Sequence, residues 1–176
     1  MTYLSFQDES LAAVSEALEI AEDKTGDFYK FSIDQWKKHR YDVKTLESLA
    51  DNEISSYGFA LLNKYSRVGN LLESKMNDSD FYLICLQDHH IIDALRRDKN
   101  LKLLSLLVYI FTHELVHIVR FCNFFQRFEV SGMGKEREER LVHEITYKIL
   151  QRICLPSMDY ILESYSRHRL GEPVFS

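Results

Sequence analysis

The stretch that decides the fold is the apolar segment LLSLLVYIFTHELVH, which runs from Leu103 to His117. Its uninterrupted apolar part, residues 103–111, is too short to span a bilayer, because a span takes about 20 mainly apolar residues. Imidazole and charged groups then follow on the same predicted helix. The sequence therefore predicts a buried core helix from about Asp98 to Phe125 and no membrane span.

The second half of this segment carries the motif H-E-x-x-H, formed by His113, Glu114 and His117. The two histidines are four residues apart, so on a helix they lie one turn apart on the same face. Two imidazoles in this arrangement can bind one zinc ion, and the glutamate can accept a proton from a metal-bound water. Such groups are costly in an apolar helix unless they are paired or bound to metal. We therefore predict zinc bound by His113 and His117, with Glu114 as general base.

A catalytic zinc needs a third protein ligand, which we look for on the next predicted helix, Lys135–Cys154. On a helical wheel, Glu139 and His143 form an i,i+4 pair on a largely buried flank, whereas Glu144 projects to the opposite side. We predict Glu139 as the third metal ligand. His143 is then either a metal ligand itself or a partner that holds Glu139 or a ligand histidine. Glu138 lies within the apolar face and stays an alternative, because the phase of a predicted helix is good to about one residue.

The rest of the chain predicts more helices and a small sheet. Helices are expected over Asp8–Lys24 with Gly26 as the stop, from Ser32 through Trp36, over Thr45–Asn52, over His89–Arg97 and over Ser157–His168. Strands are expected over Tyr57–Tyr65 and Phe81–Gln87, paired in a small sheet, and a loop is expected over Val130–Gly134. The order predicts an α+β fold, dominated by helices, in one domain of residues 1–176.

Composition narrows the class of protein. The net charge of -5 argues against a dedicated nucleic-acid binder, which usually has a basic face. Cys85, Cys122 and Cys154 are odd in number and widely spaced in apolar surroundings, which favours free thiols in a reducing cytoplasm. The first residues, MTYLSFQD, have neither the positive nor the apolar region of a signal peptide. We expect a cytoplasmic protein with no nucleic-acid or membrane partner.

The motif residues His113, Glu114 and His117, with the glutamate-bearing stretch 136–144, resemble the zincin metallopeptidases. The resemblance is to the gluzincin branch, in which a glutamate on a later helix completes the metal site. The ending Cys154-Leu155-Pro156 is similar to the end of the glutamate helix in the ImmA/IrrE-like group. The resemblance implies a zincin-like fold, with a small sheet packed on the active-site helix, and a cytoplasmic zinc-dependent metalloprotease. Alignment of the ImmA-like group from Pro156 would place the third ligand nearer Glu144.

The resemblance also implies a mechanism. Glu114 would take a proton from zinc-bound water, which attacks a peptide bond of a peptide or protein substrate. The extended substrate would lie along the strand that ends at Gln87, by strand addition. Candidate second donors to the oxyanion are His89, His90, Tyr147 and Tyr160.

Two other classes of protein fit parts of this pattern. A zincin-like fold that binds a metal or a protein partner without turnover would carry the same motif. The element Glu114-x-x-His117 also occurs in carboxylate-bridged di-iron helical bundles. Those bundles use two such elements, whereas Glu139 and His143 are four residues apart and no second Glu-x-x-His is present.

Overall fold

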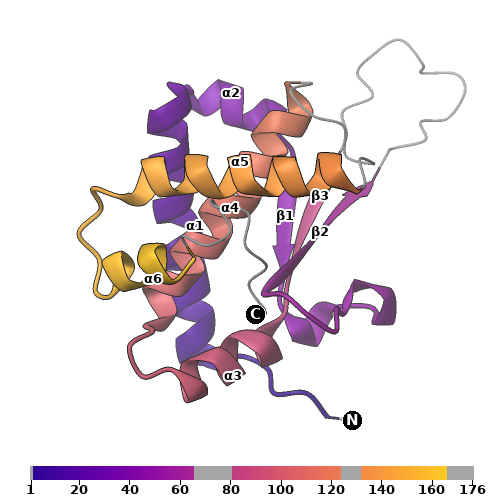
Figure 1. Ribbon diagram of the computed structural model, residues 1–176. Coiled ribbons are helices and arrows are strands. Elements are labelled where there is room, and N and C mark those ends of the chain that lie inside the picture. The colour runs from indigo at the N-terminus through magenta and orange to yellow at the C-terminus, as the bar shows by residue number, and fades with distance from the viewer. Residues whose placement is uncertain (1, 66–80, 124–131, 166–176) are drawn as a thin grey trace, which may run out of the picture.

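The computed structural model describes residues 2–65, 81–123 and 132–165, which form an α+β fold dominated by helices (Figure 1). The elements are α1 (Asp8–Tyr29), α2 (Ile33–Lys38), β1 (Tyr41–Lys44), β2 (Ala60–Tyr65), β3 (Phe81–Leu86), α3 (Asp88–Arg97), α4 (Leu103–Cys122), α5 (Met133–Leu150) and α6 (Met158–Ser164). Two short 3-10 turns, Leu46–Ser48 and Asp51–Glu53, lie between β1 and β2. The predicted class, α+β with helices dominant, is confirmed.

The centre of the fold is α4, the predicted core helix. By length and composition α4 could cross a membrane, but 78% of its most apolar window is buried inside the fold. Helix α1 packs along α4 most extensively, and the fully buried Ala17 and Ala21 let the two backbones come close. Helix α5 crosses in front of α4 in Figure 1, and α6 also packs against α4. This core positions the face of α4 that carries the H-E-x-x-H motif.

The sheet has the strand order β1-β3-β2, so β3 is its central strand. Strand β3 pairs in parallel with β1 and antiparallel with β2. Its side chains alternate: Tyr82, Ile84 and Leu86 join the hydrophobic core with the helices, and Cys85 is buried on the opposite face. The predicted pairing of the two strands is confirmed. The expectation that the strand ending at Gln87 offers a free edge is wrong, because both edges of β3 are paired; the edge strands are β1 and β2.

The first helix is longer than predicted, because a tertiary contact overrides a local signal. Gly26 lies inside α1, which ends at Tyr29 and is followed by Lys30 in the left-handed conformation. A Cβ atom at Gly26 would stand 2.7 Å from Nε1 of Trp36. The glycine therefore makes room for the indole ring instead of ending the helix.

The segment Thr45–Asn52 is not the predicted helix. It holds two separate 3-10 turns, and the short strand β1 precedes it. Side chains distant in sequence fix this shape: the backbone N–H of Leu46 donates to the buried carboxylate of Asp88 at 3.1 Å. The buried carboxylate of Glu53 accepts from the backbone N–H of Ala50 at 2.9 Å. These hydrogen bonds take up backbone donors that a helix would use differently.

The boundaries of α2 and α3 agree with the local sequence signals, whereas those of β2 and α5 differ from the predicted ones. The capping box of Ser32 and Gln35 opens α2 as predicted, and α3 forms over Asp88–Arg97. Strand β2 begins later than predicted, two residues after Gly58, whose φ is +82°. Helix α5 starts at Met133, so Met133 and Gly134, which were predicted to be in the loop, are helical. The parts of the predictions at residues 124–125, 130–131 and 166–168 lie outside the described residues.

Candidate metal centre

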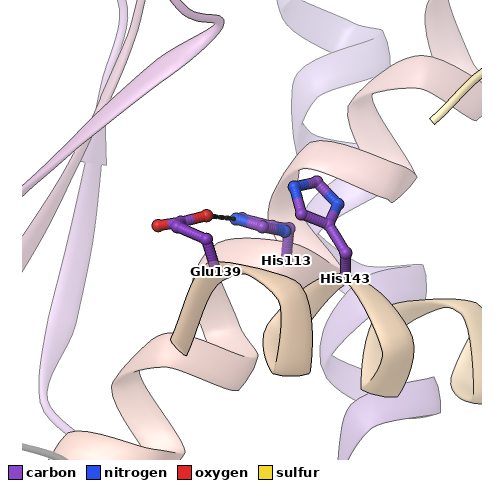
Figure 2. Close-up of side chains that lie close together, drawn as sticks. All are labelled: His113, Glu139 and His143. Atoms are coloured by element: carbon purple, nitrogen blue, oxygen red, sulfur yellow. Dashed lines mark ion pairs between the residues drawn. The ribbon is translucent and has the colours of Figure 1, made fainter. Parts of the chain in front are cut away.

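Polar side chains from α4 and α5 converge where the two helices cross. The Nε2 atoms of His113 and His117 are 3.2 Å apart. The carboxylate of Glu139 spans both rings, with Oε2 3.3 Å from Nε2 of His113 and Oε1 3.1 Å from Nε2 of His117. Figure 2 shows Glu139 directed at His113, with His143 on the other side of that ring. One ring nitrogen of His113, one of His143 and a carboxylate oxygen of Glu139 lie within 4.8 Å of one another.

The contacts among His113, His117 and Glu139 are close to the length that a shared zinc ion requires. Bonds of about 2.0–2.1 Å to a tetrahedral zinc place neighbouring ligand atoms about 3.3 Å apart. The observed contacts are 3.1, 3.2 and 3.3 Å long, and Glu139 makes its two with different oxygens, Oε1 to His117 and Oε2 to His113. The side chains of His113 and His117 are 11% and 8% exposed, whereas that of Glu139 is 40% exposed. The two histidines of α4 are therefore shielded from solvent, and the cluster is open to solvent on the side of Glu139.

The electrostatics of the cluster call for a shared cation. Burial raises the pKa of Glu139, but hydrogen bonds to His113 and His117 and their charges lower it by more, so the net pKa is well below the usual range. Burial lowers the pKa of His117, but the hydrogen bond and charge of Glu139 raise it by more. Closely spaced acceptor atoms repel unless a cation lies among them. That cation is either a proton on His117 or a metal ion.

Ring packing holds the two histidines in this orientation. The ring of His117 stacks on Phe121 with a centroid distance of 5.6 Å, and that of His113 lies 4.3 Å from the ring of His143. The buried Nδ1 atoms of His113 and His117 have no hydrogen-bond partner among the described residues. A ligand histidine usually donates its second N–H to an acceptor. In the described part of the chain, the rings are fixed by neighbouring aromatic side chains instead.

Glu114 lies between the two histidines in sequence and interacts electrostatically with both and with Glu139. Burial raises its pKa, which the charges of His113 and His117 partly offset. Its carboxylate makes no hydrogen bond to a described residue, in contrast to the buried carboxylates of Asp88 and Glu53. A carboxylate with a raised pKa and no structural partner is suited to exchange protons with a ligand.

The competing glutamates of α5 have other partners. Glu138 forms a bidentate ion pair with Arg120 of α4, at 2.5 Å from Nε to Oε1 and 3.0 Å from Nη2 to Oε2. Glu144 points outward and pairs with Lys148 at 2.9 Å, with both side chains about half exposed. Among these three glutamates of α5, the helical phase thus places Glu139 against the histidines of α4, and Glu138 and Glu144 elsewhere. The Arg120–Glu138 pair fixes α5 on α4 directly beside the cluster.

Most of the predicted oxyanion donors are engaged elsewhere. His90 contacts the carbonyl of Ser55 through Nε2 at 3.1 Å, and the ring of His89 lies on that of His90. The hydroxyl of Tyr160 donates to Asp98 at 2.6 Å. Tyr147 packs against the hydrophobic core.

One side chain next to the cluster was missed from the sequence. The hydroxyl of Tyr109 is 2.5 Å from Nδ1 of His143, and both side chains are buried. Tyr109 lies one helical turn before His113, a position that could have drawn attention to it.

No family model, curated protein or solved structure matches this chain. The fold and the cluster define an α+β protein in which two crossing helices present a His-His-Glu set of candidate metal ligands. Among the described residues, His113, Glu139 and His143 form the one group of three such side chains whose possible ligand atoms lie within 4.8 Å of one another, and His117 contacts two of them.

Proposed function

We propose that the protein is a zinc-dependent metallopeptidase of the zincin type, in which His113, His117 and Glu139 hold the metal. The observation that carries the proposal is the convergence of these side chains: Nε2 of His113 lies 3.2 Å from Nε2 of His117, and the Glu139 carboxylate lies 3.1–3.3 Å from both, through a different oxygen for each. Three protein ligands with one side open to solvent are characteristic of catalytic zinc, whereas structural zinc has four protein ligands. When bound, zinc would act as a Lewis acid and lower the pKa of a water molecule.

In this proposal Glu114 is the general base. It would accept a proton from the attacking water and then deliver it to the leaving amine of the cleaved peptide bond. Support comes from its raised pKa in the metal-free protein and from the absence of a hydrogen bond to any described residue. A raised pKa makes the Glu114 carboxylate a stronger base than an ordinary glutamate.

The proposed substrate is an extended peptide or protein segment, and β2 is the candidate strand along which it would lie. Within the sheet of the described residues, β2 is an antiparallel edge strand. The residue before it, Phe59, contacts the ring of Tyr165, which stacks on Tyr109 at 5.1 Å. This chain of ring contacts leads from the start of β2 to the side chains next to the cluster. Main-chain hydrogen bonds to a free strand edge are a general way to bind peptides.

The proposed location is the cytoplasm, since all three cysteines are free thiols. The di-iron alternative has less support. The described residues include a three-stranded sheet, and they hold a single cluster of possible metal ligands instead of the two Glu-x-x-His elements of a bundle.

Two measurements test the proposed function. Elemental analysis of the purified protein is expected to give one zinc per chain; two irons, or no metal after zinc is supplied, would refute the zinc site. Hydrolysis of fluorescently labelled casein is expected from the zinc-loaded protein and not from Glu114→Gln, which keeps its zinc. The control is Glu144→Gln on the exposed face of α5, which keeps both zinc and hydrolysis. Zinc binding without hydrolysis in the unaltered protein would favour an inactive zincin-fold binding module.

A further inference from the structure

A buried tyrosine and histidine form a pair immediately beside the candidate ligands. Tyr109 is one turn before His113 on α4, and His143 is one turn after Glu139 on α5. The tyrosine hydroxyl lies 2.5 Å from Nδ1 of His143, and the two side chains are 6% and 8% exposed. The ring of His143 is 4.3 Å from that of His113. The pair therefore packs beside the side chains of His113, His117 and Glu139, whose mutual contacts are 3.1–3.3 Å long.

The acidity of the two groups indicates which one donates in this contact. A phenol is a stronger acid, and so a stronger donor, than a neutral imidazole N–H. With the Tyr109 hydroxyl as the donor to Nδ1, neutral His143 would carry its proton on Nε2.

This tautomer decides what His143 can do. A metal ligand needs a lone pair, but the lone pair of Nδ1 accepts from Tyr109 and Nε2 carries hydrogen. In the view of Figure 2, one nitrogen of His143 lies on the side toward Glu139 and the other on the side away from it. In this tautomer His143 would present an N–H group toward a molecule bound beside Glu139 and would have no lone pair for a metal.

The position of His143 shows that little prevents it from becoming a ligand. Its candidate nitrogen lies within 4.8 Å of the candidate atoms of His113 and Glu139. A tetrahedral zinc requires about 3.3 Å between ligand atoms, so a shift of at most about 1.5 Å would bring His143 into coordination. With His113, His117 and Glu139 it would then complete four protein ligands, which leaves no position for substrate.

We propose that Tyr109 is a positioning residue that keeps His143 out of the metal coordination sphere, so that His143 is a hydrogen-bond donor at the open position. The proposal rests on the proposed zinc site. The group that would receive this hydrogen bond is an oxygen atom of the bound ligand, such as the carbonyl oxygen of an amide. A purely structural hydrogen bond between two buried side chains is the competing explanation, and it predicts no change in metal coordination when either partner is altered.

The test uses Tyr109→Phe, His143→Ala and the double variant, with Tyr160→Phe as the control, since its hydroxyl bonds Asp98 away from the cluster. Zinc affinity is measured by competition with a chelator. We expect His143→Ala and the control to bind zinc as the unaltered protein does. Tyr109→Phe is expected to bind zinc about 10- to 100-fold more tightly, the scale on which neighbouring groups tune metal affinity. The double variant should return to the affinity of His143→Ala, because the added ligand is gone.

A cobalt-substituted protein adds a spectroscopic readout. Acetohydroxamate, a small ligand with a carbonyl oxygen, should change the cobalt absorption of the unaltered protein. We expect it to bind His143→Ala about tenfold more weakly, as for the loss of one hydrogen bond, and not to bind Tyr109→Phe. A loss of zinc affinity in His143→Ala, or Tyr109→Phe with unaltered affinity and acetohydroxamate binding, would overturn the proposal.

A measurement on the unaltered protein covers the case in which a variant fails to fold. Long-range nitrogen–proton NMR correlations of His143 report its tautomer directly, with or without metal. We expect the proton on Nε2; a proton on Nδ1 would overturn the proposal even if zinc binds. Failure of the unaltered protein to bind zinc would instead refute the proposed function, and this proposal with it.

Discussion

Replacement of Arg120 by methionine should destabilise the fold strongly, because it leaves a carboxylate buried without its partner. Arg120 and Glu138 form a bidentate ion pair between α4 and α5, and their side chains are only 14% and 8% exposed. Removal of one member of a buried pair costs about 3–5 kcal/mol. A domain has a total stability of about 5–15 kcal/mol, so Arg120→Met is expected to fold with a much reduced free energy of unfolding.

Urea unfolding of the metal-free protein measures this effect without a contribution from zinc. The matched control is Lys148→Met, which breaks the exposed pair with Glu144 on α5 and should cost less than about 0.5 kcal/mol. The double variant Arg120→Met/Glu138→Leu should recover most of the loss, because no charge is then left buried. A loss below about 1 kcal/mol in Arg120→Met, or a double variant as unstable as the single one, would refute this reasoning.

Three further predictions follow from other parts of the structure. Gly26→Ala should lower the free energy of unfolding by about 1–3 kcal/mol through overpacking against Trp36; a gain of about 1 kcal/mol, as helix propensity alone predicts, would contradict it. Burial, and then the charge of Glu53, raise the pKa of Cys85 to about 11. Iodoacetamide at pH 8 should therefore label the exposed Cys154 and leave the buried Cys85 unmodified, and mass analysis of the peptides measures both. Zinc must displace the proton that His117 holds, so zinc affinity in chelator competition should fall as the pH drops through the raised pKa of His117; a pH-independent affinity would argue against His117 as a ligand.

The contribution of His117 to the stability of the metal-free protein falls as the pH rises, whereas the zinc affinity rises with pH. The pKa of His117 is raised above its ordinary value of 6.5, because the effect of Glu139 outweighs that of burial. Its stabilising contribution is therefore fully present below about pH 6.5 and is lost as the pH rises through the raised pKa. Glu139 has a lowered pKa, so its contribution is present above its ordinary value of 4.5 and lost in acid.

The elements that the sequence predicted well have strong local signals. The 3.6-residue period of α5 turned Glu144 outward and Glu138 inward, and both orientations are found in the structure. The capping box at Ser32 and the apolar run of α4 also act over a few residues. For such signals, the neighbours that decide the structure are close in the chain.

The elements that were missed depend on contacts between distant residues. Strand β1 has four residues and is defined by parallel pairing with β3 about 40 positions later, from Tyr41 with Tyr82 onward. The 3-10 turns before β2 depend on Asp88, which binds the N–H of Leu46. In the candidate site, the spacing of Tyr109 one turn before His113 is visible in the sequence, but its contact with His143 of α5 is not. Sequence periodicity gives the face of a helix but not the atom that meets it from another element.

The most direct test of the central claim is the position of the metal itself. Crystals grown with zinc, with diffraction data collected on both sides of the zinc absorption edge, would locate the ion without any assumption about its ligands. We expect a single anomalous peak per chain, about 2.0–2.2 Å from Nε2 of His113, Nε2 of His117 and a carboxylate oxygen of Glu139. A peak at another set of side chains, or no peak among these three with zinc in excess, would contradict the proposed metal centre.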